Sequence, residues 1–149
     1  MKEKEQKKMS ILEVYGFEQR SKTELPLFLA KISAGFPSPA DDYIDKKLDL
    51  NEYLVKHPAA TFFVKVEGDS MLNAGINSGD ILIVDRALHP ADNKVVIAVL
   101  GGELTVKRIR KKRGKLYLMP ENPDFTPMEI NDEMDFEVWG VVTHVIHPL

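Results

Sequence analysis

The 149-residue sequence contains no cysteine. It therefore has neither disulfide bonds nor a thiolate metal site, although this absence does not by itself assign a compartment. No apolar run approaches the ~20 residues that span a membrane, and no signal-peptide core opens the chain. We therefore expect no membrane association and a cytoplasmic location. The net charge of −3 argues against a protein that binds polyanions through its overall charge.

Charge is distributed unevenly along the chain. Residues 1–34 hold seven Lys/Arg and five Asp/Glu, whereas residues 35–149 hold thirteen and eighteen. The length fits one domain with a modest core plus an arm. We therefore expect an N-terminal arm over residues 1–34 and an acidic body over residues 35–149.

Ser70 and Lys107 are the candidate catalytic residues. A serine hydroxyl is a poor nucleophile until a base takes its proton. A lysine in water has a pKa of ~10.4, so only about 1 in 2,500 is neutral at pH 7. Burial can lower that pKa by roughly 3–5 units. Lys107 follows Val106 and precedes Ile109 in an expected strand, which fits an apolar site for a lysine base.

The residues around Ser70 fit a nucleophile turn. Gly68 lets the backbone turn sharply before the serine. The turn can aim the backbone N–H groups of Asp69 and Ser70 at an oxyanion. Upstream, Ala34-Gly35 is a bond between small residues, which an extended arm could bring into a narrow cleft. These features suggest a protease that cuts its own arm.

Spacing alone leaves other interpretations open. Gly-Asp-Ser stretches are commonly ordinary turns, and we read Asp69 as a turn residue rather than a triad acid. Lys94 also precedes an apolar strand and is a rival base. A histidine could instead form a Ser-His pair, although turn and core roles are expected because none lies in a nucleophile or metal motif. The four histidines are His57, His89, His144 and His147.

Several motifs in order resemble the LexA/UmuD family of self-cleaving SOS-response proteins, from about Gly35 to His147. Within the family the chain is similar to the UmuD-like accessory proteins, because residues 1–34 are too short for the helix-turn-helix domain of the repressors. The motifs are Ala34-Gly35-Phe36-Pro37-Ser38-Pro39-Ala40, Asp49-Leu50-Asn51, His57-Pro58-Ala59-Ala60-Thr61, Gly68-Asp69-Ser70-Met71, Ser78-Gly79-Asp80-Ile81-Leu82-Ile83-Val84-Asp85, Glu103-Leu104-Thr105-Val106-Lys107 and Val138-Trp139-Gly140-Val141-Val142-Thr143-His144-Val145.

The resemblance implies specific roles. The family's nucleophile falls on Ser70, its general base on Lys107 rather than Lys94, and its scissile bond on Ala34-Gly35. It implies a homodimer without cofactor or metal, cleavage stimulated by a RecA–single-stranded-DNA filament, and association of the shortened form with a Y-family, UmuC-like polymerase subunit in translesion synthesis. Two alternatives are a binding module that cuts nothing and a peptidase that acts on other proteins.

The expected fold is mainly β: an antiparallel, partly closed barrel or sandwich with a short helical segment and an extended N-terminal arm. Met1 to Ser10 reads as a mobile tail, and residues 11–34 as an extended arm that packs on the body. Helices are expected from Ser38-Pro39 and after Asn51, the second ending near His57-Pro58. Gly101-Gly102 is a hairpin turn. The expected strands are Thr61–Val66, Ile81–Val84, Lys94–Leu100, Glu103–Arg110, Lys115–Met119 and Phe136–His147.

Seven of the nine residues 107–115 are basic. A patch that binds DNA or a protein is one interpretation, and a solvated hairpin turning at Gly114 is the favoured one. Trp139 lies in an apolar strand and is expected in the core or in a dimer seam.

Overall fold

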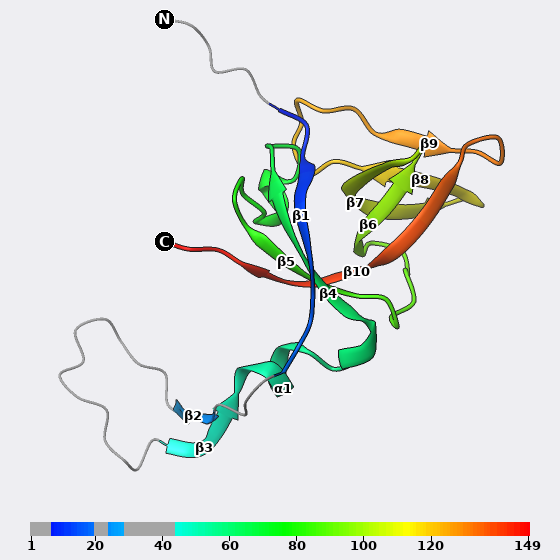
Figure 1. The fold of residues 1–149 in the computed structure, drawn as a ribbon. Coiled ribbons are helices and arrows are strands. Elements are labelled where there is room, and N and C mark those ends of the chain that lie inside the picture. The colour runs from blue at the N-terminus through cyan, green and yellow to red at the C-terminus, as the bar shows by residue number, and fades with distance from the viewer. Residues whose placement is uncertain (1–6, 20–23, 29–43) are drawn as a thin grey trace, which may run out of the picture. The chain divides into compact units, whose positions relative to one another are not determined.

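The computed structural model describes residues 7–19, 24–28 and 44–149 (Figure 1). The chain forms two compact units. The larger contains residues 7–17 and 57–149, and the smaller contains the described parts of residues 18–56.

The larger unit is one antiparallel sheet in the order β1-β4-β5-β10-β6-β7-β8-β9. The sheet curls, so that β1 at one end contacts β7 (Figure 1). This half-barrel confirms the predicted mainly β, antiparallel and partly closed fold. The strands are β1 (Ser10–Gly16), β4 (Thr61–Glu67), β5 (Ile81–Asp85), β6 (Val95–Leu100), β7 (Glu103–Lys112), β8 (Lys115–Met119), β9 (Met128–Ile130) and β10 (Phe136–Ile146).

Two apolar clusters pack on the sheet, and β6 contributes to both. Successive side chains of a strand point to opposite faces. Ile97 accordingly enters one cluster, while Val96 and Ala98 enter the other. This explains why β6 is a continuous apolar run rather than an alternating one. Trp139 packs against the first cluster, with its ring 6.3 Å from that of Phe62, as the core interpretation predicts.

The six predicted strands are present, with small differences at their ends. β7 runs to Lys112, two residues beyond the prediction, and pairs with β8 through a turn at Arg113 and Gly114. The predicted hairpin between β6 and β7 turns at Gly101 and Gly102, whose φ values of 58° and 82° favour glycine. β1 confirms that this part of the arm is extended and packs on the body.

The smaller unit pairs β2 (Glu24–Phe28) with β3 (Ile44–Asp49), followed by α1 (Leu50–Leu54). The Asp49 side chain caps α1 by accepting a hydrogen bond from the Asn51 backbone N–H at 3.0 Å. The predicted second helix is present but begins earlier, at Leu50, and ends at Leu54 rather than near His57-Pro58. The helix expected to start at Ser38-Pro39 and the Ala34-Gly35 bond both lie outside the described residues.

Two 3₁₀ turns connect elements of the larger unit: Pro58–Ala60 before β4 and Leu72–Ala74 after Ser70. Among the described residues, no helix has the length and apolar character needed to cross a membrane.

Candidate active site

Ser70 lies in the turn that follows β4. Gly68 opens this turn with a φ of 117°, a backbone conformation that residues other than glycine rarely adopt. The Ser70 side chain is fully buried, and its backbone carbonyl accepts a hydrogen bond from the Glu121 N–H at 2.8 Å. The Asn122 side-chain amide donates to the Asp69 carbonyl at 2.8 Å. The 121–122 segment therefore fixes the backbone beside the hydroxyl, a contribution that the sequence motifs did not indicate.

Lys107 lies on β7, opposite Val96 of β6. Its Nζ is 3.0 Å from Ser70 Oγ and donates a hydrogen bond to it. The side chain is 9% exposed, and burial, followed by the charge of Lys8, lowers the pKa of Lys107 to about 8. At that pKa about one lysine in ten is neutral at pH 7, compared with about one in 2,500 for a free lysine. The pair therefore has the separation and the electrostatics that proton transfer from serine to lysine requires.

A pocket of about 200 Å³ opens beside Lys107. Apolar side chains line most of it, including Leu100, Leu118 and Phe125. Thr105 also lines it, two residues before Lys107, and its buried hydroxyl has no hydrogen-bond partner among the described residues. The pocket can therefore hold an apolar side chain next to an unsatisfied hydroxyl group.

Residues 7–9 lie on the Ser70 turn. The Asp69 N–H donates to the Lys7 carbonyl at 2.6 Å, and the Met9 N–H donates to Ser70 Oγ at 3.0 Å. A Cβ atom on Gly68 would lie 2.4 Å from the Lys8 carbonyl oxygen and from the Met9 Cα, so this close approach requires glycine. The Asp69 N–H, one of the two predicted oxyanion donors, thus donates to the Lys7 carbonyl in this structure.

The prediction of a mobile tail is wrong for residues 7–10. Met9 is 1% exposed and belongs to the first apolar cluster with Val64, Val66 and Met71. The tail contains few apolar residues, but one buried methionine and several backbone hydrogen bonds are sufficient to hold it. Composition could not reveal this contact because the receiving surface is formed by residues 60 positions away.

The rival candidates lie elsewhere. Lys94 is exposed just before β6. The Asp69 carboxylate accepts a hydrogen bond from the Lys7 N–H at 3.2 Å, which fits a turn residue better than a triad acid. Among the described residues, no cluster of side chains has the composition of a metal site.

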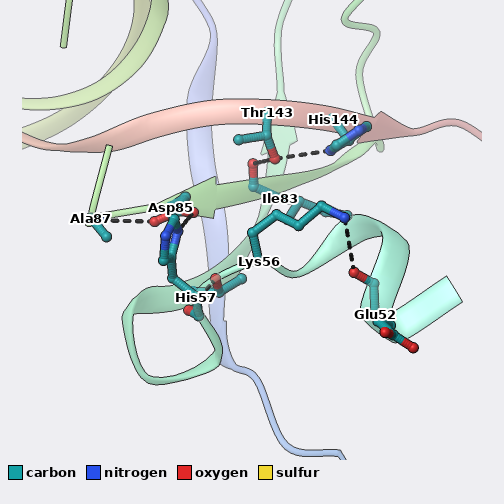
Figure 2. Close-up of polar contacts among 9 residues, drawn as sticks. Glu52, Lys56, His57, Ile83, Asp85, Ala87, Thr143 and His144 are labelled. Carbon is teal, nitrogen blue, oxygen red and sulfur yellow. Dashed lines mark hydrogen bonds and ion pairs between the residues drawn. The ribbon is translucent and has the colours of Figure 1, made fainter. Parts of the chain in front are cut away.

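All four histidines are exposed: His57 and His89 lie outside the strands, as the turn interpretation predicts, but the predicted core role is wrong for His144 on β10 and for His147 after it. His57 and His147 contact buried carboxylates at the two ends of β5, Asp85 at 2.6 Å and Asp80 at 2.5 Å. Figure 2 shows His57 against Asp85, whose other oxygen accepts the Ala87 N–H. On β10, His144 contacts the Thr143 hydroxyl at 3.0 Å (Figure 2). His89 is exposed in a loop.

The basic residues 107–115 form the predicted hairpin. Beyond Lys107, three of its cations pair with carboxylates: Arg108 with Glu121, Arg110 with Asp92, and Lys115 with Glu129. The hairpin borders an open hollow of about 830 Å³. These ion pairs involve three of the six cations in residues 108–115, and a role in binding DNA stays a prediction.

Comparison with known proteins decides the family. The Peptidase S24-like family model matches residues 26–143. The chain belongs to the Peptidase S24-like family. This S24-like chain is 46% identical to Protein MucA of Salmonella typhimurium over 128 residues, which cover 84% of the chain and 87% of the relative. It is 48% identical to Protein SamA of Salmonella typhimurium strain LT2 over 122 residues, covering 82% and 84%.

A third relative of the S24-like chain is a repressor. The LexA repressor of Bordetella parapertussis is 36% identical over 122 residues, which cover 82% of this chain but 56% of the repressor. The match to MucA, SamA and LexA confirms the resemblance to UmuD-like members of the LexA/UmuD family.

Proposed function

We propose that this chain is a self-cleaving serine peptidase in which Ser70 and Lys107 form the catalytic dyad and Ala34-Gly35 is the bond cut. The observation that carries the proposal is the buried Ser70 Oγ–Lys107 Nζ contact of 3.0 Å, with the pKa of the lysine lowered to about 8. Membership of a peptidase family supports it.

The proposed reaction has two steps. Neutral Lys107 takes the Ser70 proton as Oγ attacks the Ala34 carbonyl carbon, and the backbone N–H groups of Asp69 and Ser70 stabilise the oxyanion. The C–N bond then breaks as Lys107 returns the proton to the Gly35 amine, which leaves an acyl group on Ser70. Water, deprotonated by Lys107, hydrolyses this ester and releases the Ala34 carboxylate. Because the bond belongs to the same chain, positioning supplies much of the rate advantage.

We further propose that cleavage separates an arm of residues 1–34 from a body of residues 35–149. The body functions in the cytoplasm as a homodimer and as an accessory subunit of an error-prone, Y-family polymerase. A RecA–single-stranded-DNA filament stimulates the cut. Support comes from the relatives named above and from the resemblance to UmuD-like SOS proteins.

The direct test is to incubate the purified protein, with and without the RecA filament, and to measure intact masses. The expected product begins at Gly35, and a new N-terminus elsewhere would reject the assigned bond. Sedimentation before and after cleavage is expected to show dimers, with tighter polymerase binding after cleavage. A monomeric product contradicts the dimer, and equal polymerase binding contradicts the switch.

The second candidate is a regulatory module that binds a polymerase or repressor without cutting. The observation that favours it is that residues 7–9 cover Ser70 in this structure. If the mass stays unchanged at alkaline pH and with the filament, this candidate replaces the first. A peptidase acting on other proteins would instead turn over added peptides.

A further inference from the structure

Residues 7–16 form a strand held along one edge of the sheet. β1 pairs antiparallel with β4, from Ser10 opposite Glu67 to Gly16 opposite Phe62. It lies at the end of the sheet, alongside β4 (Figure 1). Towards the N-terminus the contacts continue over the Ser70 turn, through the Lys7 carbonyl and the Met9 N–H. A continuous backbone surface, from β4 to Ser70, therefore binds one extended segment.

Few side chains anchor this segment. Met9 is buried, and Ile11 packs against the same apolar cluster. Three large apolar residues of β1 are about half exposed: Leu12, Val14 and Tyr15. Backbone pairing plus two apolar anchors at i and i+2 is the arrangement of a peptide added to a sheet edge. It differs from a core strand such as β5, in which four of five residues are buried.

The segment also lies on the arm side of Ala34-Gly35. Cleavage there would leave no covalent link between residues 7–16 and the body. Once the segment leaves, the β4 backbone groups that pair with β1 become unpaired, while those that pair with β5 stay paired, and the Met9 position in the cluster is uncovered. An open edge beside an apolar socket readily pairs with another extended chain. A processed second copy has lost residues 7–16 and cannot supply the same segment, which favours another protein as the source of the replacement.

We propose that the β4 edge and the Ser70 turn form a docking groove for an extended polypeptide. In this structure residues 7–16 fill the groove. After they leave, an extended segment of a partner protein, with apolar side chains at the Met9 and Ile11 positions, takes their place. The release step rests on the proposed function, whereas the groove itself does not. While filled, the groove also covers Ser70, so the Ala34-Gly35 segment must displace residues 7–9 before it reacts.

The test displaces the segment without cutting the chain. In full-length protein whose mass shows it uncleaved, Met9→Asp with Ile11→Asp puts two carboxylates into the apolar cluster. The matched control, Leu12→Asp with Val14→Asp, makes the same charge change on exposed side chains. The probe is a fluorescent synthetic peptide of residues 7–17, followed by anisotropy. We expect it to bind the anchor variant at least tenfold more tightly than the wild type or the control.

Two further readouts decide the outcome. Hydrogen exchange of the β4 amides that face β1 should be faster in the anchor variant and should slow when peptide is added, whereas the amides that face β5 should not change. Labelling of Ser70 by a fluorophosphonate should be faster in the anchor variant and should be inhibited by the peptide. An opened β4 edge that binds no peptide would overturn the proposal, and so would an edge that stays protected in the anchor variant. Bound peptide that leaves Ser70 labelling unchanged would overturn the extension of the groove to Ser70.

Two controls separate folding and self-association from docking. If the carboxylate variant fails to fold by circular dichroism, Met9→Ala with Ile11→Ala weakens the same anchors and should give intermediate binding. If the anchor variant forms larger assemblies that the peptide dissociates, the groove joins copies of this chain and the assignment to a partner is wrong. None of these measurements requires a cleaved bond, so their failure is distinguishable from failure of the proposed function.

Discussion

Lys107 lies within β7 and Lys94 directly precedes the neighbouring strand β6, yet their surroundings differ. Lys107 is opposite Val96, its side chain is 9% exposed, and its Nζ contacts Ser70. Lys94 precedes β6, where its carbonyl accepts the Ile109 N–H at 2.8 Å and its side chain remains exposed. Position within the sheet, rather than local sequence, therefore determines which lysine is desolvated. Desolvation is the larger of the two causes that lower the pKa of Lys107.

The largest expected effect is a contrast between these two lysines. Lys107→Ala removes the proposed base and should slow self-cleavage about 10³-fold or more, because residues of a catalytic unit fail together. Ser70→Ala should do the same, and the double variant should be hardly slower than either. Lys94→Ala should cleave within about twofold of the wild type, because the Lys94 side chain is exposed just before β6 and substitutions of exposed surface residues have small effects. Intact mass against time measures all four proteins.

Circular dichroism of each variant verifies that the fold is retained. If Lys94→Ala abolished cleavage and Lys107→Ala did not, the base would be misassigned. If neither variant changed the rate, Ser70 would have a different base or none.

The pH dependence sharpens the same comparison. Only neutral lysine accepts the serine proton, so the rate should increase with pH and level off above the pKa of about 8. Between pH 6 and pH 8 the neutral fraction of such a group rises about 50-fold. A lysine base in free solution would keep the rate rising towards ~10.4, and a histidine base would place the midpoint near ~6.5. Initial cleavage rates in buffers of constant ionic strength distinguish the three profiles.

Much of the body could be predicted from the sequence, because the strands and turns that form it carry strong local signals. The Gly101-Gly102 turn and the continuous apolar run of β6 are such signals. β1 lacks such a local signal, because its Leu12, Val14 and Tyr15 are about half exposed. It becomes a strand because β4 offers a free edge. β9 is three residues long and, among the described strands, pairs with β8 alone, so it too depends on a partner strand.

The candidate site was only partly accessible to sequence reasoning. The choice of Lys107 over Lys94 came from the family resemblance, and the 3.0 Å contact with Ser70 agrees with it. Gly68 was expected to permit a turn, and its φ of 117° confirms this. Its second consequence, room for residues 7–9, depends on a tertiary contact that no local pattern reports. The same holds for Asn122, which follows β8 by three residues and reaches back to Asp69.

Asn122 is expected to have a smaller effect on the cleavage rate than Lys107, because it positions the Ser70 turn. Asn122→Ala removes the amide that donates to the Asp69 carbonyl and should slow cleavage by about three- to tenfold, since one hydrogen bond contributes roughly 1 kcal/mol. Asn131→Ala is the matched control, because the Asn131 side chain accepts a local hydrogen bond from the Glu133 N–H, two residues along the chain. The pH midpoint should stay the same in both variants, because the surroundings of Lys107 are unchanged. A shifted midpoint would show that Asn122 acts on the lysine rather than on the turn.

The smallest expected effect concerns the His57–Asp85 pair, which resembles a catalytic pair in chemistry but not in location. His57 is about half exposed and its Nδ1 is 2.6 Å from a carboxylate that is 5% exposed. His57→Gln keeps a hydrogen-bonding side chain beside Asp85, which also retains the Ala87 N–H, so the free energy of unfolding should fall by about 1 kcal/mol or less. Cleavage should stay within about twofold of the wild type, because the histidine contacts the end of β5 and not Ser70.

His89→Gln, in an exposed loop, is the matched control and should alter neither the free energy of unfolding nor the cleavage rate. Urea unfolding and the intact-mass assay give the two measurements. Loss of cleavage in His57→Gln with stability preserved would contradict the lysine mechanism and support a Ser-His pair formed in another conformation.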